Sequence, residues 1–167
     1  SLCKEQQGCR FLQTKIESSP MIAEHIILKG ILNHGIIDII TDQFGNYLIQ
    51  KLIEKLESNS LKQVKQIVSL QNILLYKIFE NFRKIALHRF GTRVIQRLIE
   101  YLNSDEDVLL LLSKIEGLIG VLMKNSNAYH IVLKFITRFR EKEELITTIY
   151  SLLGFNIIDY SNHKSGC

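Results

Sequence analysis

A short motif recurs along the chain, and it constrains the fold more than any other feature of the sequence. The four full copies share a small first residue, a central apolar pair and usually a final glutamine; they are Gly8–Gln13, Gly45–Gln50, Gly91–Gln96 and Ala128–Leu133. A fifth copy begins at Gly166. Self-similarity at a period of about 40 residues is typical of solenoids, in which stacked units complete one another's cores.

Each motif is followed by apolar residues with helical spacing. If the residue after the glycine is position 1, positions 3, 4, 7, 8 and 11 are apolar. In the second unit these residues are Leu48, Ile49, Leu52, Ile53 and Leu56; in the third they are Val94, Ile95, Leu98, Ile99 and Leu102; in the fourth they are Ile131, Val132, Phe135, Ile136 and Phe139. The first unit keeps Phe11, Leu12 and Ile16 but has Lys15 at position 7. At about 100° per residue, positions 1, 2 and 5 share a face opposite this core stripe.

The segments between the motifs also have helical patterns. Helices are predicted from Ser19-Pro20 to about His34, over Leu61–Leu75, from Val108 onward, and over Glu141–Leu153. Pro20 suits a first helical turn, and Ser104 is a predicted N-cap. One interval between motifs is longer than the others, and its extra residues are expected between Ser58 and Phe90, mostly in Gln66–Arg83.

The composition agrees with an all-α fold and limits the classes of function. The chain has a single proline and is 46% hydrophobic. Its three cysteines and five histidines lack metal-ligand or disulfide spacing, which indicates no metal and a reducing compartment. No apolar run is long enough to cross a bilayer, and no catalytic constellation occurs, so neither membrane insertion nor an enzyme is expected. A net charge of +4 permits a nucleic-acid partner without requiring one.

Three of the motifs resemble the RNA-contacting helices of the Pumilio/FBF (PUF) family, with a divergent fungal-type member as the nearest kind. They read Gly-Cys-Arg-Phe-Leu-Gln from Gly8, Gly-Asn-Tyr-Leu-Ile-Gln from Gly45, and Gly-Thr-Arg-Val-Ile-Gln from Gly91. The resemblance implies a curved, right-handed α-solenoid of about four three-helix PUF-like repeats. Residues 1–167 are then expected to form a single array, and a fragment of a longer one. Its approximate repeats are 1–33, 34–79, 80–116 and 117–153, with the start of a fifth in 154–167.

The resemblance also implies roles for the residues on the exposed face. Positions 1 and 5 contact the edge of one RNA base per repeat; here they are Cys9, Gln13, Asn46, Gln50, Thr92 and Gln96. Position 2 stacks between bases; here it is Arg10, Tyr47, Arg93 and His130. The chemistry is suitable, because an amide both donates and accepts hydrogen bonds, and stacking on a flat side chain contributes about 1–3 kcal/mol per base. The fourth repeat is degenerate, since it has Tyr129 and Leu133 at positions 1 and 5.

By the family's code, the first and third repeats resemble adenine readers and the second resembles a uracil reader. Because the family binds RNA antiparallel to its repeats, the implied target is 5′-N-A-U-A-3′, with little selectivity at the fourth repeat. The implied function is binding of A/U-rich single-stranded RNA in messenger 3′ untranslated regions. The chain would then be a cytoplasmic post-transcriptional regulator with protein co-regulators, and without a cofactor or small-molecule substrate.

Several alternatives stay open at this level. A HEAT- or armadillo-like scaffold for a protein partner would have a similar helical pattern, and the small net charge and degenerate fourth unit favour it. The cations at position 6, Lys51, Arg97 and Lys134, either attract phosphates or are simply solvated. The motif glycines are expected to serve the turn before each helix.

Overall fold

The computed structural model describes residues 2–18, 20–33, 35–55 and 65–155, and it gives the side chains of all of these except 20–24, 65–69 and 155. Within these ranges the chain is helical, with connecting turns and no strand. The predicted all-α solenoid of repeated units is confirmed. The Gly166 motif, Leu56 and the break at Ser58–Ser60 lie outside the described residues.

Each repeat contributes three kinds of helix. The motif helices are α1 (Gln6–Ser18), α4 (Gly45–Glu54), α7 (Gly91–Tyr101) and α10 (Tyr129–Phe139). The outer helices are α2 (Pro20–Asn33), α5 (Lys65–Glu80), α8 (Asp105–Glu116) and α11 (Glu143–Phe155). Short helices precede the motifs: the 3-10 helix η1 (Leu2–Lys4), α3 (Ile36–Ile40), α6 (Phe82–Ala86) and α9 (Ile119–Lys124).

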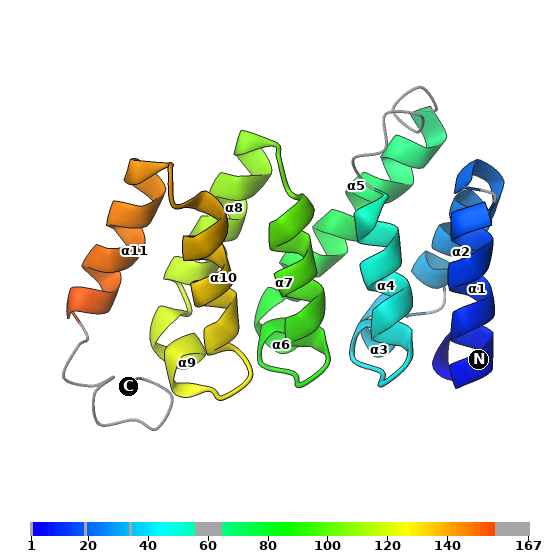
Figure 1. The fold of residues 1–167 in the computed structure, drawn as a ribbon, viewed down its shortest axis with the longest axis horizontal. Coiled ribbons are helices and arrows are strands. Elements are labelled where there is room, and N and C mark those ends of the chain that lie inside the picture. Colours follow the sequence, from blue (N-terminus) through cyan, green and yellow to red (C-terminus); the bar gives the residue numbers. More distant parts are fainter. Residues whose placement is uncertain (1, 19, 34, 56–64, 156–167) are drawn as a thin grey trace.

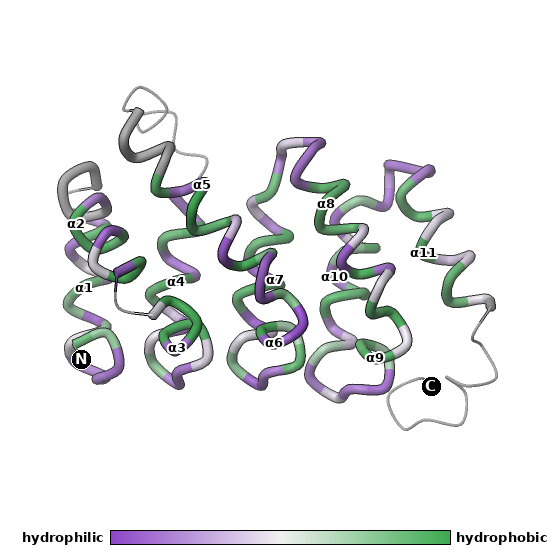
Figure 2. Tube along the Cα trace, turned by 180° about the vertical axis from the view of Figure 1, so that it is seen from behind, coloured by the Kyte–Doolittle hydropathy of each residue, from purple (hydrophilic) through white to green (hydrophobic). Residues whose placement is uncertain are grey.

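The motif helices stand side by side in one row, from α1 to α10, as Figure 1 shows, and each contacts the next motif helix. The short helices lie along one edge of this row, below the motif helices in the view of Figure 1. Among the outer helices, α2 contacts α5, and α8 contacts α11. Figure 2 shows hydrophobic and hydrophilic residues alternating along the helices, as expected when each helix buries only one side.

The core follows the predicted stripe. The side chains at positions 3, 4, 7 and 8 of α4 and α7 are all buried, and in α10 only Ile136 is partly exposed. They form one continuous hydrophobic cluster with residues of the outer and short helices. The stripe is therefore covered on both sides wherever a motif helix has neighbours.

Phe11 does not belong to this core, so its predicted burial is wrong. Its side chain is 55% exposed, whereas the equivalent Leu48 and Val94 are fully buried. The reason is position: among the described helices α1 stands at the end of the row, and one of its sides has no motif helix beside it. Lys15 lies above the exposed ring, with its Nζ 5.4 Å from the ring centroid.

The predicted outer helices are confirmed with shifted ends. Ser104 caps α8 by accepting a hydrogen bond from the N–H of Asp107, as expected. The helix predicted over 61–75 is described over Lys65–Glu80, so it continues past its predicted end, while residues 61–64 lie outside the described part of the chain. It has 16 residues where α8 has 12, so part of the longer interval is extra length in α5. No helix in the described part of the chain is long and apolar enough to span a membrane.

Candidate nucleic-acid interface

A side-chain acceptor fixes the turn before three of the motif helices. The residue three places before the motif accepts hydrogen bonds from two successive backbone N–H groups, at 2.8 to 3.4 Å. The acceptor is Oδ1 of Asp42, Nδ1 of His88 and Oδ1 of Asn125. Three different residue types thus fix the direction in which a motif helix begins. Because the residues are not identical, comparing the repeats for identical residues does not find them.

The motif glycines stand where the turn meets the motif helix, and close packing, not a left-handed backbone, requires glycine there. Among the described residues only Gly35 has a positive φ. A Cβ on Gly45 would lie 2.7 Å from the carbonyl oxygen of Ile39 in the preceding short helix. A Cβ on Gly91 would collide with the carbonyl oxygen of Ile85 in the same way. Glycine therefore lets the short helix lie against the start of the motif helix.

Positions 1 and 5 are joined by a hydrogen bond in each of the first three repeats. The amide nitrogen of the glutamine donates to the side chain four residues earlier, over 3.1 Å in Gln13–Cys9, 2.9 Å in Gln50–Asn46 and 3.3 Å in Gln96–Thr92. Among the described residues no other protein group binds these amides. One N–H and the carbonyl oxygen of each glutamine are therefore free for a ligand.

In the first and third repeats, position 1 also reaches the next repeat. The Cys9 thiol donates to the carbonyl of Phe44, and the Thr92 hydroxyl donates to the carbonyl of Asn127, both over 3.1 Å. Each of these carbonyls belongs to the residue just before the next motif. Burial raises the pKa of the Cys9 thiol above its ordinary 9.0, against the opposing effect of the Gln13 hydrogen bond, so the thiol keeps the proton that it donates.

Asn46 differs, because its donors stay within its own repeat. Its Nδ2 donates to the carbonyls of Asp42 and Gln43, at 2.8 and 3.0 Å. Its Oδ1 is left to accept from Gln50. In all three repeats position 1 thus gives its protons to backbone carbonyls and presents an acceptor to the glutamine.

The three positions differ in exposure. Position 1 is buried, with Cys9, Asn46 and Thr92 at most 4% exposed, and the glutamines lie over it half-buried. Position 2 is exposed in all four repeats; Tyr47, for example, is 47% exposed. The structure therefore brings the predicted residues together in two layers, but the prediction that position 1 lies on the exposed face is wrong, because this residue is buried beneath the glutamine. We call the surface made by positions 1, 2 and 5 the motif face.

The fourth repeat has a different surface. The rings of Tyr129 and His130 lie against each other, with centroids 4.0 Å apart. Leu133 is 48% exposed where the other repeats present an amide. This part of the motif face offers flat and apolar groups, and fewer hydrogen-bonding ones.

A hollow of about 480 Å³ lies on the motif face across the first three repeats. Its lining includes Cys9, Arg10 and Gln13 of the first repeat and Tyr47 of the second. It also includes Arg89, from the turn before α7, which the sequence prediction did not select.

Beside the motif face, a line of ion pairs joins one motif helix to the next. Position 6 of each helix pairs with the glutamate at position 9 of the helix before it: Lys51 with Glu17 at 2.7 Å, Arg97 with Glu54 at 3.7 Å, and Lys134 with Glu100. Lys51 and Arg97 also pair with the glutamate three residues later in their own helix. We call these six residues the charge ladder.

The sequence left two possibilities for the cations at position 6, attraction of phosphates or simple solvation, and the charge ladder agrees with neither. Lys51, Arg97 and Lys134 are neither free for phosphates nor simply solvated, because a carboxylate of the neighbouring helix binds each of them. The hydrogen bond to Lys51 lowers the pKa of Glu17. Burial opposes the same change in Glu100, but Lys134 and Arg97 still hold its pKa below the ordinary 4.5.

Comparison with known proteins gives one family. The model of the Pumilio-family RNA-binding repeat matches residues 1–32, 35–69 and 81–116. Pumilio homolog 11 of Arabidopsis thaliana is 33% identical over 139 residues, which are 83% of this chain and 23% of that protein. Suppressor protein MPT5 of Saccharomyces cerevisiae is 28% identical over 99% of this chain and 19% of its own length.

Solved structures agree with this result. The Puf4 RNA-binding domain, bound to the HO endonuclease RNA 3′ UTR recognition sequence, superposes with a TM-score of 0.84 at 32% identity. The match covers all of this chain and 48% of that domain. Yeast Puf5p bound to MFA2 RNA gives a TM-score of 0.79 at 27% identity, over 99% of this chain and 44% of Puf5p's. The chain thus spans about a fifth to a quarter of these curated relatives and about half of these solved domains.

Proposed function

This chain belongs to the Pumilio family of RNA-binding repeat proteins, and from that membership we propose that its motif face binds single-stranded RNA selectively. One observation carries the proposal. In three successive repeats a glutamine is oriented by an acceptor at position 1, beside an exposed arginine or tyrosine at position 2. Such a surface suits unpaired bases, whose edges and faces are both accessible. It also favours RNA over the protein-binding scaffold, which has no need of glutamine in register.

The proposed mechanism uses one base per repeat. The free N–H and carbonyl oxygen of Gln13, Gln50 or Gln96 meet the edge of the base. Position 1 lies underneath, and it controls both the orientation of the amide and the space left for the base. Position 2 stacks between neighbouring bases, where Arg10, Arg93 and Tyr47 present exposed flat groups.

The proposed target is 5′-N-A-U-A-3′, read by the repeats in reverse order. The second repeat, with Asn46 and Gln50, is assigned uracil, and the first and third are assigned adenine. The fourth repeat contributes stacking by His130 and little selectivity, because Leu133 cannot hydrogen-bond a base. The division into repeats 1–33, 34–79, 80–116 and 117–153, with a fifth beginning in 154–167, is part of this proposal.

The wider role rests on the relatives. Puf4 and Puf5p were solved bound to RNA, and the RNA bound to Puf4 is a 3′ UTR recognition sequence. We therefore place the target in 3′ untranslated regions and assign the chain to cytoplasmic control of messenger stability or translation, together with protein co-regulators.

Binding to short RNAs at stated salt concentrations tests the proposal. The chain is expected to prefer an RNA containing AUA over shuffled controls, and Gln50→Ala is expected to weaken that preference. The double change Asn46→Ser and Gln50→Glu is expected to move the preference of the second repeat from uracil towards guanine. Equal binding to all sequences, together with a neutral Gln50→Ala, would reject the base-reading role.

A further inference from the structure

Arg89 is a cation beside the motif face, and base reading does not use it. It lies in the turn between α6 and α7, two residues before the third motif, and its side chain is exposed. Its guanidinium carbon stands 4.4 Å from the centroid of the Phe90 ring. Stacking on a ring restrains a guanidinium while leaving its in-plane N–H groups free to bind an anion.

The hollow beside Arg89 has an uncompensated positive charge. Two arginines, Arg10 and Arg89, line it, and no carboxylate does. Neither arginine forms an ion pair within the described part of the chain. The cations at position 6 are already paired with glutamates of the charge ladder. The guanidiniums of Arg10 and Arg89 therefore remain as positive charges where the proposed RNA would lie.

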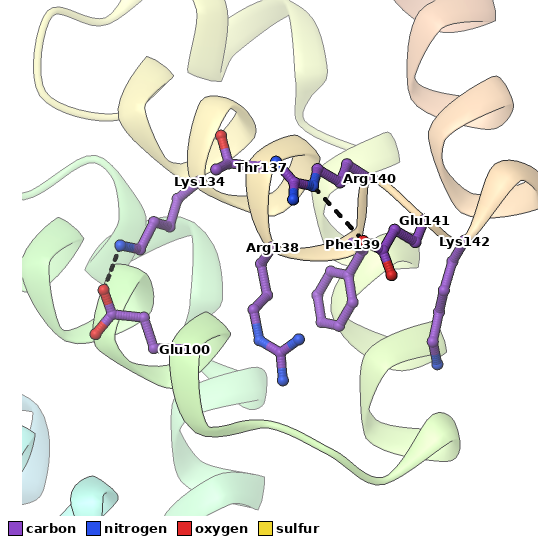
Figure 3. A pocket seen from close by; sticks show the side chains of 8 residues that line it. All are labelled: Glu100, Lys134, Thr137, Arg138, Phe139, Arg140, Glu141 and Lys142. Atoms are coloured by element: carbon purple, nitrogen blue, oxygen red, sulfur yellow. Dashed lines mark ion pairs between the residues drawn. The ribbon is translucent and has the colours of Figure 1, made fainter.

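A second hollow on the molecule is lined by basic residues too, but acidic residues line it as well. It lies at the end of α10, and Figure 3 shows basic side chains around it. Three of its four cations lie close to a carboxylate: Lys134 pairs with Glu100, and Arg140 lies 3.9 Å from Glu141. Lys142 pairs with Asp105, whereas Arg138 donates to the amide oxygen of Asn103. The hollow beside Arg89 differs in that no carboxylate lines it, whereas Glu100 and Glu141 line the second hollow.

We propose that Arg89 binds a backbone phosphate of the RNA, at the nucleotide that lies over the hollow formed by the first three repeats. The inference rests on the proposed function, and it assigns Arg89 a role separate from base reading. A guanidinium matches the geometry of phosphate oxygens and forms charge-assisted hydrogen bonds with them. Because Phe90 already restrains the side chain, little conformational freedom is lost on binding.

The repeats themselves supply a matched variant. The residue equivalent to Arg89 is Gln6 in the first repeat, Gln43 in the second and Ser126 in the fourth. Arg89→Gln therefore installs a side chain that the fold already accepts at this place. Arg89→Lys keeps the charge. Arg140→Gln removes the same charge from the other hollow, where the side chain is 75% exposed.

The test measures affinity for a short RNA containing AUA at several salt concentrations, for residues 1–167 and each variant. Arg89→Gln is expected to weaken binding about fivefold, the scale of one exposed charge pair. The slope of log K against log salt should become shallower by about 0.7, the value for one phosphate on a single strand. The preference for AUA should not change, Arg89→Lys should retain the slope, and Arg140→Gln should match the original chain.

RNAs with a single uncharged methylphosphonate linkage identify the phosphate. Neutralising the linkage at Arg89 should weaken the original chain and leave Arg89→Gln unaffected. If Arg89→Gln equals the original chain in affinity and slope while AUA is still preferred, the phosphate role is wrong and base reading stands. If Arg89→Gln changes base preference at constant slope, Arg89 reads a base and the phosphate role is again wrong. A chain with no sequence preference would instead overturn the proposed function.

Discussion

The hydroxyl of Thr92 donates a hydrogen bond to the backbone carbonyl of Asn127, 35 residues further along the chain. The same oxygen accepts from Gln96, so one side chain connects the packing of two repeats to the orientation of a proposed base-reading amide. Cys9 makes the equivalent pair of bonds, with Phe44 and Gln13.

Replacing Thr92 by valine should test both connections, since valine keeps the shape and removes the hydroxyl. We expect the free energy of unfolding to fall by about 1 kcal/mol, because a partly buried hydrogen bond between two repeats is lost. Selectivity of the third repeat should fall as well, because the Gln96 amide is no longer fixed. Urea denaturation and binding to RNAs varied at that base measure the two effects. Thr137→Val is the control, since the Thr137 hydroxyl bonds only within its own helix; equal losses in both variants would contradict the role of Thr92.

The charge ladder should make stability depend on pH on the acid side. The pKa values of Glu17 and Glu100 are lowered in the folded chain, so their stabilisation is complete above the ordinary 4.5 and is lost as the pH falls through the lower folded values. Glu100→Gln should therefore be less stable than the original chain near neutral pH, and the difference should shrink below about pH 4.5. Urea denaturation across this range measures it.

Glu116→Gln is the matched control for the charge ladder, because Glu116 has no ion pair within the described residues. This variant should differ little from the original chain at any of these pH values. Added salt should also reduce the effect of Glu100→Gln, since the pairs are partly exposed. A difference that is independent of both pH and salt would mean that packing, not charge, explains the effect of Glu100.

The turn acceptors should be interchangeable. His88→Asn places the residue type of Asn125 before the third motif and should keep most of the stability. His88→Ala should cost about 1 kcal/mol, the scale of a lost helix-capping side chain. Thermal or urea unfolding of the two variants compares them directly. If asparagine and alanine are equally destabilising, the hydrogen bonds to Nδ1 of His88 contribute nothing to the fold.

Gly91→Ala should destabilise the chain by about 1–3 kcal/mol, because its new methyl group would meet the carbonyl of Ile85 and force a backbone shift. Gly30→Ala provides the opposite case, since a Cβ there meets nothing within 4 Å and the residue lies inside α2. That change should leave the chain equally stable or more stable by up to about 1 kcal/mol. Equal effects at both positions would show that close packing is not what requires glycine at Gly91.

The fold could be predicted largely because its signals are local. A helix places residues three and four apart on one side, so the apolar spacing in α4 and α7 identified both the buried stripe and the face opposite it. The same spacing failed at Phe11, because burial also requires a neighbouring helix, and α1 has none on that side among the described residues.

For the motif face, the sequence by itself determined which residues share a surface, since the register of Gln13, Gln50 and Gln96 follows from helical geometry alone. The tertiary structure decided which groups of the protein these residues and their neighbours contact. The bonds of Thr92 to Asn127 and of Lys51 to Glu17 join residues more than 30 positions apart. Such contacts depend on how one motif helix lies against the next, and no local pattern encodes that distance. For the same reason only the folded chain shows that Lys51 is paired with Glu17 while Arg89 has no ion pair among the described residues.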